Sequence, residues 1–239
     1  ARIPHEGARP RPARGGSPAL APDSGEPASP GEPATARAPE PARALPPRVS
    51  WHDHRLLPWI ASGLGMFFSA GVVQIIVGFI VQDRLGLPPQ RAVSLTAVML
   101  LANAAGAMLM QLVAVPRLGW SPQRLLRAGL TTAVIALSSL ALAPSLPIMA
   151  ASTFFLGIAM GLVGPGFTAG GSLAVSAAEQ GGVAGILNAT GAVTWIFAPV
   201  TATALYGWQP LAPFVLALAV LSASTAVAWA HPRMRAARP

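Results

Sequence analysis

The spacing of charged residues along this chain of 239 residues restricts its fold more than any other feature. Between Arg55 and Arg233 there are only seven ionised residues, and the long uncharged stretches between them measure 27, 25, 51 and 53 residues (56–82, 92–116, 128–178 and 180–232). A helix needs about 20 apolar residues to cross the hydrocarbon core of a bilayer. The two shorter stretches therefore hold one crossing each and the two longer stretches two each, which predicts six transmembrane helices.

Composition agrees with a membrane protein and argues against other classes. Hydrophobic residues make up 53% of the chain and charged residues 10%. The formal net charge is +8, but the basic residues are scattered over tails and loops rather than clustered on a folded polar surface, so no nucleic acid is expected as a partner. Cysteine is absent, which excludes disulfides and thiolate metal sites. No metal, cofactor or catalytic residue is expected.

Residues 1–50 differ in composition from the rest of the chain. They carry 12 of the 25 prolines, mixed with Ala, Gly and Arg, and cannot bury enough apolar surface to offset the entropy of ordering. They are expected to be a disordered cytoplasmic tail or a connector between two halves. Residues 51–232 form the predicted transmembrane domain, and residues 233–239 a basic cytoplasmic tail.

Prolines, glycines and charged loops divide the transmembrane domain into six predicted helices. Pro58 suits the first turn of the first helix, and Pro116 is expected to end the second. The predicted fold class is therefore an all-α membrane protein. The expected helices cover about 58–81, 92–115, 124–143, 148–170, 183–205 and 211–230.

The distribution of arginine predicts the orientation in the membrane. If the N-terminus is cytoplasmic, and residues 1–50 are left aside, seven arginines lie on the inner side and only Arg84 and Arg91 on the outer side. Cytoplasmic loops carry the excess of basic residues in membrane proteins. Both termini of this multi-pass protein are therefore expected on the cytoplasmic side of the plasma membrane.

Uncharged polar residues are the main chemical signal inside the predicted spans, which contain no Asp, Glu or Lys and no central Arg. Each such residue either bonds a neighbouring helix or lines a cavity. Gln74 shares a helix face with two glycines, and Asn188 and Trp195 share a face of the fifth helix. The polar set is Gln74, Asn103, Gln111, Asn188, Thr190, Thr194 and Trp195, and the candidates for a substrate cavity are Gln74, Asn103, Asn188 and Trp195.

The fourth predicted helix combines closely spaced glycines with a proline. Gly157 and Gly161 lie one turn apart, and Pro165 follows after another turn. Glycines at this spacing permit close helix packing, whereas the proline removes a backbone donor and favours a bend. Both interpretations, tight packing and a hinge, remain open for these residues.

The pattern of six helices, basic second loop and glycine-rich fourth helix resembles the C-terminal half of a major facilitator superfamily transporter. In that family a loop between the second and third helices of each half latches the cytoplasmic side. Arg117, Gly119 and Arg124 match its motif here, although Pro116 stands where an acidic residue is expected. The glycines, proline and tyrosine of 185–206 are similar to the family's eleventh helix.

The resemblance implies a half bundle in which the first, second, fourth and fifth helices face a cavity and the third and sixth face lipid. It further implies secondary active transport of a small molecule, such as drug or metabolite efflux, by alternating access. The expected partners are the lipid bilayer, the small-molecule substrate and a second six-helix half from the same or a separate chain. Ion-coupling chemistry is expected to lie in that other half.

Two alternatives come from other classes of protein. Rhomboid-like intramembrane serine proteases also have six helices, and Ser172 and His231 superficially fit their nucleophile and base, but no His occurs in the second helix. The chain is therefore not expected to be an enzyme. The remaining alternative is an inert or regulatory membrane fragment.

Overall fold

A computed structural model describes residues 49–235, and every regular element within that range is helical. Six spans there are long and apolar enough to cross a membrane, which confirms the predicted all-α membrane fold with six transmembrane helices. The expectations for the two tails lie outside the described residues at positions 1–48 and 236–239. The elements are α1 (Leu57–Leu85), α2 (Pro89–Met108), η1 (Leu109–Ala114), α3 (Val115–Leu118), α4 (Pro122–Leu142), α5 (Leu146–Leu173), η2 (Ala177–Glu179), α6 (Gln180–Trp208), α7 (Ala212–Ala230) and α8 (Pro232–Arg235).

The helices extend beyond most of the ends expected from hydropathy. The first was expected to stop near residue 81, yet α1 continues through Asp83 and Arg84 to Leu85. Charged side chains at a helix end can reach the headgroup region while the backbone ladder continues. The helix ends only at Gly86, whose φ of 58° is the left-handed conformation that glycine adopts without steric cost.

Pro116 lies inside the second span instead of ending it. The span runs without interruption from Pro89 to Leu118, and the segment before the proline, η1, is a π-helix. Proline has no N–H to donate to the carbonyl four positions back, and directly before it the N–H of Val115 bonds five positions back, to the carbonyl of Met110. The span therefore continues past the proline by way of a π-helical segment.

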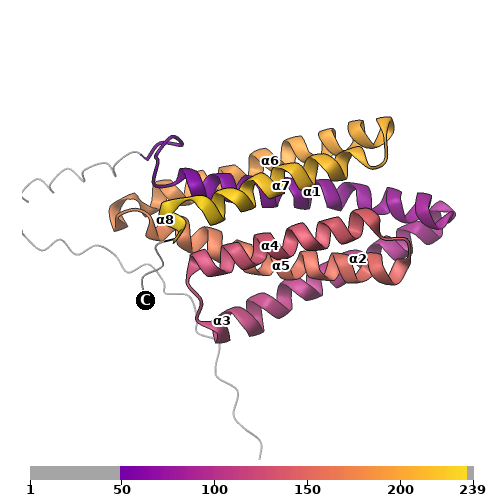
Figure 1. Cartoon of the computed structure of the whole chain (residues 1–239), viewed down its shortest axis with the longest axis horizontal. Helices are drawn as coiled ribbons and strands as arrows, with labels where there is room; N and C mark the ends of the chain where they lie inside the picture. The colour runs from indigo at the N-terminus through magenta and orange to yellow at the C-terminus, as the bar shows by residue number, and fades with distance from the viewer. Residues whose placement is uncertain (1–48, 236–239) are drawn as a thin grey trace, which may run out of the picture. The chain divides into compact units, whose positions relative to one another are not determined.

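The six spans form two groups of three that are related by their contacts. α1 packs extensively on α6 and α7, and α5 packs in the corresponding way on α2 and α4. If the first, second and third spans are exchanged with the fourth, fifth and sixth, the contacts of α1 with α6 and α7 become the contacts of α5 with α2 and α4. Successive spans run in opposite directions (Figure 1), so the two groups have the contacts and the opposite orientation expected of an inverted repeat.

The two ends of the bundle can be named from their connections (Figure 1). The terminal end holds the start of α1, the α3–α4 and α5–α6 connections and α8. The distal end holds the α1–α2, α4–α5 and α6–α7 turns. The first and last described residues thus lie at the same end of the bundle.

Aromatic rings pack on glycines where α1 crosses α5. The ring of Phe167 lies against Gly63, and the indole of Trp59 lies against Gly170. Phe67 adds an edge-to-face contact to Phe167, with ring centroids 5.3 Å apart. The absence of a Cβ at the two glycines lets these large side chains reach the opposing backbone.

Serine hydroxyls join α1 to α7. The Ser69 hydroxyl donates to the carbonyl of Ala217 at 3.1 Å, and the Ser224 hydroxyl donates to the carbonyl of Ala61 at 2.7 Å. Gly65 lies directly against Ser224. Small residues and interhelical hydrogen bonds of this kind are the usual means of holding helices together in lipid.

The glycines of α5 pack directly on the second span. A methyl group at Gly157 would collide with the backbone carbonyl of Asn103, and one at Gly161 would lie 2.8 Å from the carbonyl of Ala107. Helix α5 continues across Pro165 from Leu146 to Leu173. Tight packing therefore accounts for both glycines, while the hinge at Pro165 stays a prediction.

An ion-pair cluster ties α1 to η2 at the terminal end. Arg55 donates to the two carboxylate oxygens of Glu179 at 2.8 and 3.2 Å and also binds Asp53, with a shortest distance of 2.7 Å. The neighbouring guanidinium lowers the pKa of Asp53 to about 2, so this carboxylate is ionised at neutral pH. The cluster fixes the entry of the chain into the bundle.

Neighbouring residues of α1 tie the distal end. The guanidinium of Arg84 donates to the carbonyls of Leu140, Ala141 and Ala143 at 3.1, 2.7 and 3.0 Å, which satisfies the free carbonyls at the C-terminal end of α4. Next to it, the hydroxyl of Tyr206 donates to Asp83 at 2.6 Å. One end of α1 thus holds both α4 and α6.

The Gly157→Ala substitution tests the packing of α5 on the second span. We expect it to lower the free energy of unfolding by about 1–3 kcal/mol, because the backbone of Asn103 cannot swing away from the added methyl group. Unfolding of the protein in detergent micelles, followed by circular dichroism, measures the change.

Gly185→Ala in α6 is the matched control, because nothing lies within 4 Å of a methyl group at that position. We expect no loss there, or a gain of up to about 1 kcal/mol from helix propensity. Equal effects of the two substitutions would contradict close packing at Gly157.

Candidate functional site

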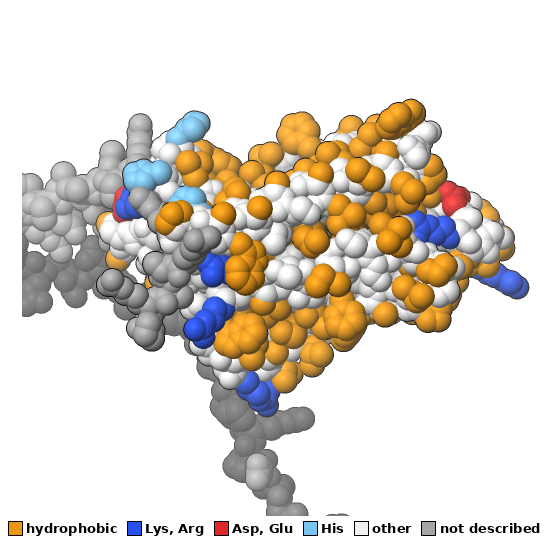
Figure 2. Space-filling view, in the orientation of Figure 1, with side chains coloured by type: hydrophobic (Ala, Val, Ile, Leu, Met, Phe, Trp, Pro, Cys, Tyr) orange, Lys and Arg blue, Asp and Glu red, His pale blue; other side chains and the backbone are white. Residues whose placement is uncertain are grey.

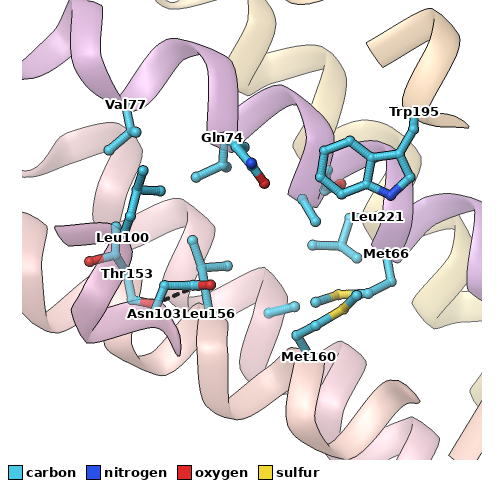
Figure 3. Close-up of a pocket in the computed structure, with 14 residues that line it drawn as sticks. Met66, Gln74, Val77, Leu100, Asn103, Thr153, Leu156, Met160, Trp195 and Leu221 are labelled. Carbon is cyan, nitrogen blue, oxygen red and sulfur yellow. Dashed lines mark hydrogen bonds between the residues drawn. The ribbon is translucent and has the colours of Figure 1, made fainter. Parts of the chain in front are cut away.

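A cavity of about 130 Å³ lies between α1, α2, α5 and α6, and we call it the central cavity (Figure 3). Three of the four predicted cavity residues, Gln74, Asn103 and Trp195, line it. Helices α4 and α7 contribute one buried apolar side chain each. The full lining is Met66, Ser69, Ala70, Val73, Gln74, Val77, Leu100, Asn103, Ala133, Thr153, Leu156, Met160, Trp195 and Leu221.

Gln74 and Trp195 enter the central cavity from different helices. Gln74 extends from α1 and the indole of Trp195 from α6 (Figure 3). Gly71 allows this approach, because a methyl group there would lie 2.8 Å from the Cβ of Ala198 on α6. The indole is 40% exposed, and the Gln74 amide makes no hydrogen bond with any residue from 49 to 235.

Asn103 plays a structural part as well as lining the cavity. Its Nδ2 donates to the carbonyl of Thr153 at 3.0 Å, which joins α2 to α5 beside the glycine contacts described above. This bond gives the Asn103 amide a hydrogen-bond partner and fixes its orientation. Asn103 thus both bonds a neighbouring helix and lines the cavity.

Met66 and Met160 line the central cavity, and the sequence did not point to either of them. Their thioethers lie near each other at one side of the space (Figure 3). Methionine is flexible and polarisable, so it adapts to ligands of different shape. The same residue also fills ordinary cores, which is why its position in a helix carries no signal of cavity lining.

A second, more open space lies between α5 and α6 with Trp195 at its border, and we call it the terminal groove. Its volume is about 630 Å³, and Asn188, the fourth predicted residue, lines it together with Gln111 and Pro165. Trp195 lines both spaces and so lies at the boundary between the groove and the central cavity. The side chains of Gln111 and Asn188 are exposed and bond to no residue in the described part of the chain.

The threonines of α6 belong to the helix rather than to the site. Thr190 and Thr194 are buried. The Thr190 hydroxyl donates to the carbonyl of Ile186 at 2.9 Å, and that of Thr194 to the carbonyl of Gly191 at 2.6 Å. Their polarity is therefore satisfied locally, in contrast to that of the amides.

The five residues Gln74, Asn103, Gln111, Asn188 and Trp195 form what we call the polar face. It joins the central cavity to the terminal groove through Trp195, which borders both. Small-molecule pockets usually measure about 300–1,000 Å³. At about 130 Å³ the central cavity is too small to enclose such a molecule alone, so the polar face is suited to form one wall of a larger site.

The residues of the expected cytoplasmic latch lie around the α3–α4 connection. Gly119 ends α3 with a φ of 57°, and Arg117 donates to the carbonyl of Val113 at 3.2 Å. Arg124 is exposed in the first turn of α4. Within residues 49–235 no carboxylate pairs with Arg117 or Arg124, in keeping with the proline at position 116.

The residues considered for proteolysis lie near the terminal end. Ser172 is in the last turn of α5, and His231 directly follows α7. No hydrogen bond joins them in the described part of the chain. Residues 49–235 contain no group of three or more His, Asp, Glu or Cys side chains that could hold a metal ion.

No protein-family model matches the chain, and no curated protein matches it. Functional inference therefore depends on the polar face and on the arrangement of the helices around it.

Proposed function

We propose that this chain supplies one half of the pathway of a secondary transporter, which moves a small amphiphilic molecule across the plasma membrane by alternating access. The observation that carries the proposal is the set of amides on the polar face. Gln74, Gln111 and Asn188 bond to no described residue, although all three lie within apolar spans.

Lipid cannot satisfy these amides. An unpaired polar group in the hydrocarbon core costs several kcal/mol, because no water is present to replace the missing hydrogen bond. A face with three such groups is therefore better suited to water, a polar ligand or another protein. A water-filled pathway next to an indole and two thioethers would accept a molecule with both apolar and hydrogen-bonding parts.

The inverted repeat supports the same proposal. Secondary transporters are commonly built from such repeats, with substrate sites near the bilayer midplane where the repeats meet. In this bundle Gln74 and Trp195 lie near the middle of α1 and α6, which belong to different groups of three. The major facilitator superfamily is the family with this architecture that the sequence resembles.

A second six-helix half is the partner that this geometry favours. The buried residues of α2 are only Ala92, Met99 and Gly106, so most of its side chains stay exposed or half-buried in the described bundle although α5 packs on the helix. A second half packed along α2 and α6 would cover part of that surface and add the opposite wall of the cavity. The partner could be a copy of this chain or a separate one.

The distribution of arginine supports a cytoplasmic terminal end. Arg55, Arg117, Arg124 and Arg127 lie there, whereas Arg84 and Arg91 lie at the distal end. The positive-inside rule then assigns both termini to the cytoplasm. Because the polar face has no ionisable side chain, we assign ion coupling to the other half.

Single cysteines test whether the polar face meets water. The chain has no native cysteine, so Gln74→Cys and Asn188→Cys can be labelled without background. We expect a membrane-impermeant cationic thiosulfonate to label both at least about tenfold faster than Ile135→Cys, because a thiol needs water to ionise and react. Labelling in native membrane vesicles, followed by mass spectrometry, measures the rates.

Ile135 is a matched control because it lies in the middle of α4 with 66% of its side chain exposed, away from the polar face. Equal, slow labelling of all three cysteines would mean that the polar face is turned to lipid, and it would overturn the proposed pathway.

Transport itself is tested by reconstitution. We expect proteoliposomes that contain an oligomer of this chain to release an amphiphilic fluorescent dye, and Trp195→Ala to slow the release at least about tenfold, since a lost aromatic contact of about 1.5–3 kcal/mol corresponds to that factor. Trp208→Ala is the control, because Trp208 is 78% exposed at the end of α6 and outside both spaces. Finding neither flux nor any oligomer would contradict transport by this chain alone.

A further inference from the structure

We propose that the terminal end carries a binding site for the phosphate group of an anionic phospholipid. The site is a cluster that we call the arginine–tryptophan patch: Arg117, Trp120 and Arg124, bordered by Arg127 and Trp229. This proposal does not depend on the transport function.

The fold places these basic residues around the α3–α4 connection at the terminal end. Arg124 and Arg127 lie three positions apart in the first turns of α4, so they share a face of that helix. Arg117 lies in α3, which the left-handed turn at Gly119 and two further residues connect to the start of α4. Figure 2 shows basic side chains gathered over α3 and the start of α4, with large hydrophobic side chains beside them.

The border of the patch is held firmly. The guanidinium of Arg127 lies over the ring of Trp229, 5.1 Å from its centroid, and its Nε donates to the carbonyl of Ala228 at 2.9 Å. The indole N–H of Trp229 donates to the hydroxyl of Thr131 at 3.3 Å. These contacts join α4 to α7 and give the patch a defined shape before any ligand binds.

The tryptophans indicate the depth of the patch in the membrane. Trp120 is 40% exposed and Trp229 is 51% exposed. Exposed indoles on membrane proteins prefer the boundary between hydrocarbon and headgroups. Arginines at the same level of the bundle therefore lie where lipid phosphates lie, and an acyl chain can continue along the apolar flank of the helices.

Among residues 49–235, carboxylates do not compete for the two outer arginines. Asp53 and Glu179 are engaged by Arg55, and Asp83 lies at the distal end with Tyr206. No other carboxylate occurs among residues 49–235, and neither Arg117 nor Arg124 pairs with one. Guanidinium groups bind phosphate oxygens with two parallel hydrogen bonds, which favours a phosphate as the missing partner.

A lipid fits this position better than a soluble anion does. The patch lies on the flank of an apolar bundle, next to exposed indoles, so a bound headgroup brings its acyl chains into contact with apolar surface as well. An anionic lipid such as phosphatidylglycerol gains this apolar contact together with the full charge attraction. Phosphatidylcholine carries its own cation and gains less from the arginines.

Native mass spectrometry of the full chain tests the proposal. The protein is purified in a neutral detergent and mixed with phosphatidylglycerol or phosphatidylcholine. We expect it to retain one phosphatidylglycerol preferentially. The double variant Arg117→Gln/Arg124→Gln should weaken that retention at least about tenfold, because the attraction that the two arginines together exert on an anionic lipid corresponds to at least that factor in affinity.

Arg91→Gln is the matched control, because Arg91 is an exposed arginine at the distal end. It should retain phosphatidylglycerol as the native chain does, and Arg124→Lys should keep part of the affinity because it keeps the charge. Circular dichroism of each variant in the same detergent establishes that the helices are intact, and an unfolded double variant is replaced by the two single variants.

Three outcomes would overturn the proposal. The first is equal retention of phosphatidylglycerol and phosphatidylcholine by the native chain. The second is an equal loss in Arg91→Gln and in the double variant, which would indicate attraction by net charge rather than a site. The third is full displacement of the lipid by millimolar inorganic phosphate or glycerol phosphate, which would indicate a site for a soluble anion.

Discussion

Close contact between helix backbones at small residues is the interaction on which the rest of this structure depends. Lipid tails are as apolar as leucine, so helices in a membrane gain little from burying large apolar side chains and associate instead where their backbones can approach. Helix α5 meets the second span at Gly157 and meets α4 at Gly129. The same contact sets Asn103 against Thr153, and it thereby builds one wall of the central cavity.

Much of the fold could be predicted because charge avoidance in a bilayer is a strong constraint. The uncharged stretches were long enough for six crossings, and six spans of that kind are present. Their ends were less predictable, because hydropathy marks the first charged residue, whereas α1 continues past Asp83 until Gly86 can adopt a left-handed conformation. The π-helix before Pro116 has no periodic signature, since it is a local change in the backbone hydrogen bonds over six residues.

The candidate site was predictable within each helix but not between helices. Spacing along a helix placed Asn188 and Trp195 on one face of α6, and both line the terminal groove. Spacing could not show that Gln74 and Asn103 meet Trp195 in the central cavity, because the rotation of each helix depends on packing against its neighbours. It also could not separate Thr190, which bonds its own backbone, from the amides that bond to no described residue. The two methionines carry no polar signal at all.

The fastenings at the two ends of α1 determine how such a bundle can move. Arg55 ties its beginning to η2, and the adjacent pair Asp83 and Arg84 ties its other end to α6 and α4. Because α1 is anchored at both ends to helices of both three-helix groups, it would move with them as one rigid body. A tilt of α1 that displaces one end in one direction would displace the other end in the opposite direction. If the chain acts in transport as proposed, opening toward one side and closing toward the other would be a single rotation of the whole bundle.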